Sequence, residues 1–588
     1  MTDPGAPGRG VDPAGRLLLG LAAIAVAFAA ADTYVVVLAL PDMMAATGLS
    51  AEALQRGAPI ISGFLLGYVA VLPLVGRIAD LRGRLPVLVG SLLLFAVGSM
   101  VTAAAYDLPS MVTGRVLQGV GGGGLVPATL ALVADLYPPR ERGLPLGIVG
   151  AVQELGNVLG PLYGAVVLAF GTWRDIFWLN LAMALVLAAV IRRSPAPGDR
   201  EQRRTPDLLG LLLLVLFLAA VLLVMLQPSA LVHDVTLGLA FLPVVGSSRW
   251  LSPVALAGYA FAALFVLRLL TAAHPLLDVR SWRSVLRRVD VLGAVLLTAA
   301  LAGVILAFAT ADPQQHVFSA EGPWFLAGSA VAAVAFWWRN RTVRNPLVPS
   351  GSLTAAPAWG ALVVSFFVGS ALIAALVDIP IFARVTIYND SQLAAALVLV
   401  RFLVGLPVGA FAGGWLTHRF PAGMVTALGM VLSAASFAWM SQWGMDSLHS
   451  PTASVPLVLA GAGIGLAMAP VNASLLSATG AEVHGVASAL LVVARTVGKL
   501  VGISALTTIG LRRYYAAQTD LPAPMDVCGH GVSRCDKFSL ILQEAGLTQL
   551  HTIFFGAAVC CLVAGAVALV VFRHADTRRV RSSIEGGF

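Results

Sequence analysis

Several charged side chains stand inside long apolar stretches of this sequence, where charge is costly. Asp32, Arg115, Glu154 and Arg495 each lie within such a stretch. Buried acids and arginines can exchange protons and form ion pairs that open and close, and a charge inside a membrane usually marks a transport or proton pathway. We therefore predict that these residues carry proton-coupled chemistry in a central cavity. The competing interpretation is static pairing that only positions helices.

Depth along the predicted spans suggests which charges meet. Asp32 and Arg115 both fall in the outer half of their spans and are expected to pair across a cavity. Glu154 and Arg495 lie at about the same depth in equivalent spans of two halves, and we predict that they form a lock that responds to proton or substrate occupancy. Two further charges of later spans are assigned to the same cavity, Asp378 and Arg401.

The composition indicates how these charges must be positioned. The chain has 588 residues, of which 58% are hydrophobic and only 11% charged, with a net charge of +8. A soluble chain would carry about a quarter charged residues. These values exclude an ordinary cytosolic enzyme, a disordered protein and a nucleic-acid binder. Long apolar runs without strand-like alternation favour helices over a β-barrel, so we predict an all-α polytopic membrane protein of 14 to 16 spans.

Arginine in the connections predicts the orientation. Connections 77–84, 140–142 and 192–204 are rich in arginine, whereas 311–322 and 442–452 contain neither arginine nor lysine. Basic residues collect in short cytoplasmic loops. We therefore expect a multi-pass protein of the plasma (inner) membrane with both termini in the cytoplasm.

The spans group into two sixes around a central insert. The expected organisation is a disordered cytoplasmic N-terminus, a six-helix half, an insert with two apolar hairpins, a second six-helix half and a cytoplasmic tail, over 1–16, 17–192, 193–356, 357–572 and 573–588. Asp207 and Asp290 open the two hairpins with the same pattern, Asp followed three residues later by Gly. This pattern indicates a duplicated pair or a chance similarity of helix starts. Loop 227–253 has apolar β-branched stretches that favour either a small β-hairpin or an element at the membrane surface.

Two patterns of glycine accompany the charges. Between the second and third spans lie Gly76, Asp80, Arg82, Gly83 and Arg84, where glycine permits a tight turn and the aspartate can cap or pair a helix end. The simpler interpretation is an ordinary basic loop. In the fifth span, a seam of small residues at intervals of four favours close helix packing, and Glu154 faces away from it. The seam consists of Gly156, Gly160 and Gly164, and the same span also contains Gly147 and Pro161, the proline allowing a bend.

These motifs resemble those of the major facilitator superfamily. Loop 76–84 is similar to the family's loop motif, which implies a gating loop, and the fifth-span pattern is similar to its antiporter motif. Residues 32–41 resemble the first-span motif of the drug:proton antiporter branch with 14 spans. Arg115 resembles a fourth-span arginine linked to proton transfer. The corresponding loop of the second half, 413–419, lacks the aspartate, so the charged gate is expected mainly in the first half.

A narrower resemblance concerns the substrate. Segments 153–156, 160–164, 173–178 and 492–495 look like the mycobacterial exporters of triacylglycerides in this family, which work with a periplasmic lipoprotein. The resemblance implies a secondary transporter that exports hydrophobic substrates such as lipids by alternating access, uses the proton gradient and needs no cofactor. The alternative is a multidrug:proton antiporter that exports amphiphilic drugs. An enzyme is not expected, because no catalytic polar cluster or soluble domain is visible.

The four cysteines are too few for a disulfide framework. Cys528 and Cys535 lie in a polar loop that is predicted to face outward, where thiols can oxidise. We expect a disulfide between them, and the alternative is an unpaired, solvated loop.

Overall fold

The computed structural model describes residues 13–575 apart from gaps at 49–53, 139–140, 194–206, 273–274, 276–284, 286–288, 310–320, 344–345, 349–352, 389–391, 481–482 and 520–535. The described residues form helices, turns and loops, with no strand among them. Fourteen of the described helices are long and apolar enough to cross a membrane, and α5 and α12, with 28 and 21 residues, are of comparable length. The predicted helical class is confirmed.

The long helices follow the chain in a first group of six, a central group of four and a last group of six. The first group is α1 Pro13–Ala46, α2 Leu54–Arg82, α3 Arg84–Ala103, α4 Leu108–Leu136, α5 Gly143–Phe170 and α6 Trp173–Arg193. The central group is α7 Leu208–Leu226, α9 Pro253–Thr271, α11 Val291–Ala309 and α12 Gly322–Thr342. The last group is α13 Ala356–Thr386, α14 Gln392–Leu416, α15 Ala422–Met440, α16 Ser454–Ser477, α17 His484–Thr519 and α19 Asp536–Val571.

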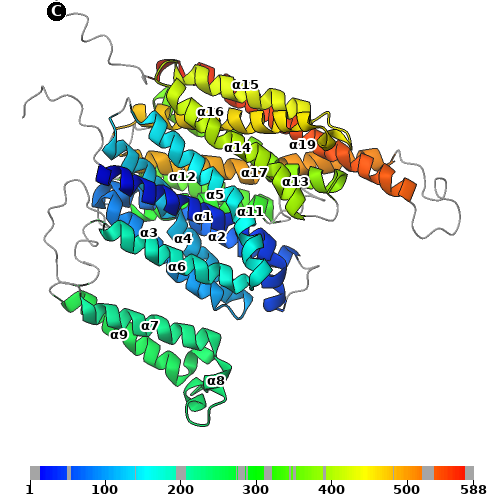
Figure 1. Ribbon diagram of the computed structural model, residues 1–588. Helices are drawn as coiled ribbons and strands as arrows, with labels where there is room; N and C mark the ends of the chain where they lie inside the picture. Colours follow the sequence, from blue (N-terminus) through cyan, green and yellow to red (C-terminus); the bar gives the residue numbers. More distant parts are fainter. Residues whose placement is uncertain are drawn as a thin grey trace, which may run out of the picture.

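Each six-helix group has its own apolar core, and the two groups pack side by side in one bundle (Figure 1). The helices run nearly along a common direction. Helix α1 packs on α5, and α13 packs on α17 in the same manner, while the groups meet where α5 lies against α14 and α2 lies against α17. The end of the bundle that holds the α2–α3 turn is called the arginine-rich end below.

The two central hairpins differ in position. Helix α11 packs against α2, and Thr298 donates a hydrogen bond to the Ala70 carbonyl oxygen at 2.7 Å. Helices α7 and α9 pack mainly on each other and stand apart from the bundle (Figure 1). Their connection holds a short helix α8, Ser229–Val232, and two 3₁₀ turns, η1 Gly238–Phe241 and η2 Arg249–Leu251. The β-hairpin alternative for 227–253 is therefore wrong, because the backbone groups there close local helical turns instead.

Candidate functional site

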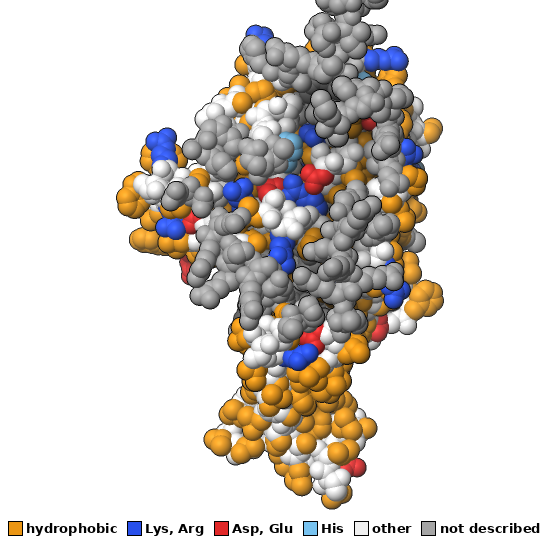
Figure 2. All heavy atoms as spheres, turned by 90° about the vertical axis from the view of Figure 1, so that its left-hand side faces the viewer, with side chains coloured by type: hydrophobic (Ala, Val, Ile, Leu, Met, Phe, Trp, Pro, Cys, Tyr) orange, Lys and Arg blue, Asp and Glu red, His pale blue; other side chains and the backbone are white. Residues whose placement is uncertain are grey.

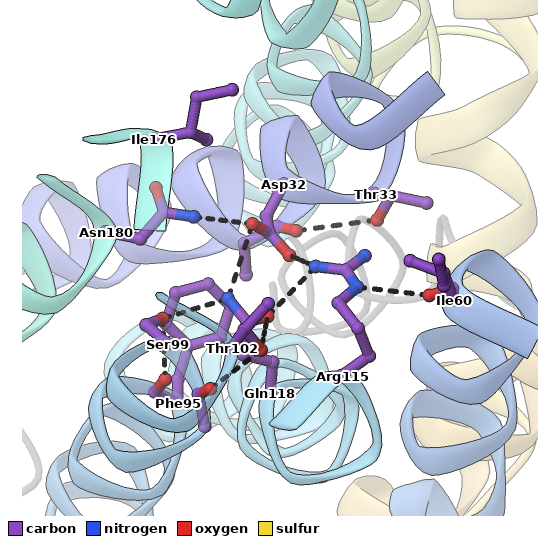
Figure 3. A network of polar contacts seen from close by, with 12 residues as sticks. Asp32, Thr33, Ile60, Phe95, Ser99, Thr102, Arg115, Gln118, Ile176 and Asn180 are labelled. Carbon is purple, nitrogen blue, oxygen red and sulfur yellow. Dashed lines mark hydrogen bonds and ion pairs between the residues drawn. The ribbon is translucent and has the colours of Figure 1, made fainter. Parts of the chain in front are cut away.

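The centre of the first group contains a fully buried ion pair. An Nη1 hydrogen of Arg115 on α4 is donated to Asp32 Oδ2 on α1 at 2.6 Å, and neither side chain has any exposed surface. The two residues are 83 positions apart in sequence. Figure 3 shows the carboxylate and the guanidinium facing each other between the helices. The pairing expected from their depth is confirmed, but the two groups touch directly, with no cavity between them.

Amide side chains complete the environment of the carboxylate. Asn180 on α6 and Gln118 on α4 both donate to Asp32 Oδ1. Gln118 also donates to Ser99 Oγ at 2.9 Å and accepts from Arg115 Nη1 at 3.0 Å. Asp32 therefore accepts hydrogen bonds on both oxygens from α4 and α6. Hydrogen-bonded buried charges of this kind hold one geometry until the charge changes.

The guanidinium group is held less completely than the carboxylate. Arg115 Nε donates to the Ile60 carbonyl oxygen on α2 at 3.3 Å, and the group lies over the Phe64 ring at 4.5 Å from its centroid. Its Nη2 is buried and has no hydrogen-bond partner in the described part of the chain. An unsatisfied buried donor costs about 1–3 kcal/mol. The site can thus accept one more acceptor atom or a rearrangement of the arginine.

Local sequence explains how α4 presents this arginine. Asp107 begins the helix with a reciprocal capping box to Ser110, and Arg115 follows two turns later on the face toward α1 and α2. Gly119 lets α4 approach α2 closely, because a methyl group there would collide with the Phe64 carbonyl oxygen. Close packing of this kind is why small residues concentrate at helix contacts in membranes.

A second charged cluster lies at the arginine-rich end. Gly83 has φ +93°, which only glycine adopts readily, and it places Arg84 at 2.6 Å from Asp80. Arg84 also contacts Asp135 at the end of α4, at 3.1 Å. Oxygens of Asp80 accept from the backbone N–H of Gly485 at 3.1 Å and of Val486 at 3.4 Å, at the start of α17. One carboxylate thus caps a helix of the other half.

The glycine seam of α5 packs on α1. A methyl group at Gly156 or Gly160 would collide with the carbonyl oxygens of Ala27 and Ala31, and one at Gly164 would meet the Val35 side chain. The predicted close packing is confirmed. Gly147, at the start of the same helix, instead faces α14 across the interface of the two groups. The side chain of Pro161 lies outside what the structure describes.

The remaining predicted residues do not join the Asp32 network. Asp378 is buried in α13, 4% exposed, and no hydrogen bond or ion pair joins it to a described residue. Arg401 donates to Ser454 Oγ at 3.2 Å, and Arg495 is buried on α17. The Glu154 side chain lies outside the described residues, so the expected lock to Arg495 stays a prediction. The same holds for the disulfide, which would join Cys528 and Cys535.

Sequence reasoning missed two members of these clusters. Asn180 was visible as an amide within an apolar run, and such polar residues inside spans usually have a partner. Asp135 gave no signal, because an acid at a helix end is common on protein surfaces. Its contact with Arg84 depends on how α3 and α4 pack, which the sequence does not display.

Comparisons with known proteins agree with this architecture. The model of a family described as the Major Facilitator Superfamily matches residues 22–340. A triacylglyceride transporter of Mycolicibacterium smegmatis is 32% identical, covering 95% of this chain and 87% of that protein. A triacylglyceride transporter of Mycobacterium tuberculosis is also 32% identical, covering 96% of this chain and 97% of that protein. Among solved structures, the human organic anion transporter MFSD10 has a TM-score of 0.50 at 14% identity, covering 95% and 100%, a likeness of fold alone.

Proposed function

The chain belongs to the Major Facilitator Superfamily, and on that premise we propose that this multi-pass membrane transporter exports hydrophobic lipids of the triacylglyceride class by proton-coupled alternating access. The observation that carries the coupling is the buried pair of Asp32 and Arg115, in which a single proton changes the net charge of the site. Breaking such a pair leaves an uncompensated charge, so its protonation state can favour one conformation.

The proposed step begins with a proton on Asp32. Neutralising this carboxylate removes the attraction that holds Arg115 between α1 and α4. Because Arg115 already has one unsatisfied buried nitrogen among the described contacts, it then gains by moving toward another acceptor. Under this proposal the arginine carries the response to α4, and Glu154 with Arg495 forms the second, corresponding lock.

The cluster at the arginine-rich end supplies a gate that this step must open. Asp80 on α2 binds the start of α17, so the two six-helix groups are joined at that end in this structure. Alternating access in such transporters is largely rocking of one half against the other. We propose that the Asp80 contact opens when the substrate site faces that end, and that this end is cytoplasmic with both chain termini.

The relatives suggest the substrate class. The curated relatives named above are triacylglyceride transporters and match nearly the full length of this chain. Export of such a lipid from the plasma membrane, with a periplasmic lipoprotein as acceptor, is the form of the proposal that follows. The competing substrate class is amphiphilic drugs, which the same machinery would move.

Reconstituted transport tests the proposal directly. Purified protein in proteoliposomes with an imposed pH gradient is given fluorescent triacylglyceride in one assay and a cationic dye in the other. We expect gradient-dependent lipid movement that Asp32→Asn abolishes. Dye movement without lipid movement would identify a drug exporter, and lipid movement that ignores the gradient would remove the coupling role of Asp32.

A further inference from the structure

The hairpin of α7 and α9 presents an apolar surface that the protein itself leaves uncovered. In the most apolar 18-residue stretch of α7 only 22% of the residues are buried inside the protein, and in that of α9 only 11%. Figure 2 shows hydrophobic side chains across the visible surface of this lower lobe. Each helix has 19 residues, about 28 Å of length, which matches the hydrocarbon thickness of a bilayer. These are the properties of a membrane-spanning pair whose outer surface contacts lipid.

Comparison with the second hairpin shows why this pair stays away from the bundle. In both hairpins an aspartate caps the first helix three residues before its glycine and binds an arginine of the return helix. Asp207 contacts Gly210 and Arg268, and Asp290 contacts Gly293 and Arg339. Because the two hairpins share these contacts, α7 and α11 can be aligned position by position from Asp207 and Asp290.

In that alignment, the side chains at matching positions of α7 and α11 differ in size. Ala294 and Thr298 of α11, one buried and one bonded to α2, correspond to Leu211 and Val215 of α7. These two α7 side chains are 46% and 52% exposed. Small and hydroxyl residues allow close approach to a neighbouring helix, whereas branched aliphatic residues suit lipid. The sequence of α7 is therefore fitted to lipid where that of α11 is fitted to protein.

The connection between α7 and α9 continues this apolar surface beyond the spans. Within eleven residues it exposes six large aliphatic side chains at 53% to 90%, namely Val235, Leu237, Leu239, Leu242, Val244 and Val245. The segment 229–251 that carries them is called the cap below. Because α7 ends at Leu226, the cap begins where the chain reaches the membrane surface. Exposed apolar groups at this density mark an interaction site.

The cap is a folded element and not an extended loop. Asp234 accepts from the N–H groups of Leu237 and Thr236, and these hydrogen bonds hold its pKa below the usual range. Val244 N–H donates to the Leu251 carbonyl oxygen at 3.0 Å, and the Phe241 side chain is buried. A preorganised apolar surface binds with less loss of chain entropy than a flexible one.

Two contacts with Tyr106 tie the cap to the six-helix core. Trp250 Nε1 donates to the Tyr106 hydroxyl at 2.9 Å, and the Arg249 guanidinium lies 3.6 Å from the centroid of the Tyr106 ring. Tyr106 directly precedes Asp107, which caps α4, the helix that carries Arg115. The cap thus stands at the bundle end opposite the arginine-rich end, beside the helix of the buried ion pair.

We propose that the cap is a membrane-docking element that inserts its aliphatic side chains into the lipid leaflet at the end of the bundle opposite the arginine-rich end. Lipid is the occupant because the patch is continuous with two lipid-facing spans and starts at the height of the membrane surface. The cap carries few charges, and Asp234 is engaged with its own backbone. Docking fixes the hairpin at two points, the leaflet and Tyr106. The proposal does not depend on which substrate is transported.

Depth-dependent fluorescence tests the docking. The four cysteines are replaced by alanine, and Val235→Cys and Val244→Cys are labelled singly with the environment-sensitive probe NBD in proteoliposomes. Asp446→Cys, exposed in a loop after α15, serves as the matched control. We expect blue-shifted emission at the two cap positions and quenching by lipids with a shallow nitroxide at least about threefold stronger than at the control.

Two results would overturn the proposal. Water-like emission and control-level quenching at both cap positions would show that the cap stays in solvent. A blue shift that lacks lipid quenching and grows with the protein-to-lipid ratio would show that a second copy covers the patch. Thermal unfolding of each labelled variant must match that of the cysteine-free parent, and Leu239→Cys replaces any variant that fails this comparison.

Discussion

The two six-helix halves use the same packing but treat buried charge differently. In the first half, Asp32 is surrounded by donors from α4 and α6. In the second half, Asp378 is equally secluded, yet no described residue pairs with it. Among the described residues, the pseudo-symmetry of the helices therefore does not extend to the surroundings of these two acids.

The inner turns show the same asymmetry. The first-half turn joins Asp80, Arg84 and Asp135 and reaches α17. In the corresponding turn of the second half, no acid is present, and Arg419 lies over the Trp415 ring at 4.3 Å. The charged contact between the two halves, from Asp80 to the start of α17, therefore depends on the first-half turn.

Breaking the buried pair should have the largest effect. Arg115→Gln leaves Asp32 without its cation in a fully buried site, and such a loss costs about 3–5 kcal/mol. We expect a strong fall in the unfolding temperature and no pH-driven transport, measured by scanning fluorimetry and in proteoliposomes. The double variant Asp32→Asn with Arg115→Gln should recover much of the stability but not the transport. Normal stability of the single variant would contradict the assignment.

Glycine substitutions in α5 and α17 test the close helix packing that the two halves share. A methyl group at Gly160 or at its second-half counterpart Gly502 meets the backbone of the facing helix, at Ala31 and Ser370 respectively. Overpacking typically costs about 1–3 kcal/mol. Both alanine variants should therefore be destabilised by similar amounts, as measured by thermal unfolding. Gly90→Ala, where no neighbour lies within 4 Å, is the control and should be neutral or slightly stabilising, because alanine favours a helix interior over glycine.

Weakening the Asp80 contact should release the start of α17. Asp80→Asn keeps an acceptor but removes the charge that favours a helix N-terminus, a contribution of up to about 2 kcal/mol. Hydrogen exchange of the Gly485 and Val486 amides should accelerate about tenfold. Arg419→Gln, in the equivalent turn, should leave this exchange unchanged. Equal effects of the two variants would remove the proposed asymmetry.

The smallest effect should come from the second-half acid. Asp378→Asn replaces a buried acid for which the described residues supply no partner, so stability should stay within about 1 kcal/mol or rise. Asp32→Asn, by contrast, removes a charge that Arg115 needs and should lower stability. Thermal unfolding of the two isosteric variants gives the comparison. A fall of equal size at Asp378 would mean that the halves treat their acids alike.

Much of this organisation follows from local sequence. Uninterrupted apolar runs predict the long helices, because backbone groups in lipid must bond within their own segment. The four-residue spacing of Gly156, Gly160 and Gly164 predicted a close helix contact, because it places small residues on one face of the helix. The repeated Asp and Gly at the two hairpin starts likewise predicted two similar helix caps, and the structure has both.

Other features arise only when distant segments meet. The pattern of 227–253 favoured strands as well as a surface element, since β-branched residues suit both, and the structure has short helical turns there. Neither Asn180 nor Asp135 could be assigned a partner from its neighbours in sequence.

The sequence by itself determined that the chain is a helical membrane protein and which residues bear costly charge. These properties depend on composition and on contacts within a few residues. Tertiary structure alone decided that Asp32 has three hydrogen-bonding side-chain partners while Asp378 has none among the described residues, that Asp80 caps a helix 405 residues away, and that one hairpin joins the bundle while the other stands apart from it. Electrostatic and packing energies depend on separation in space, and chain order does not fix that separation.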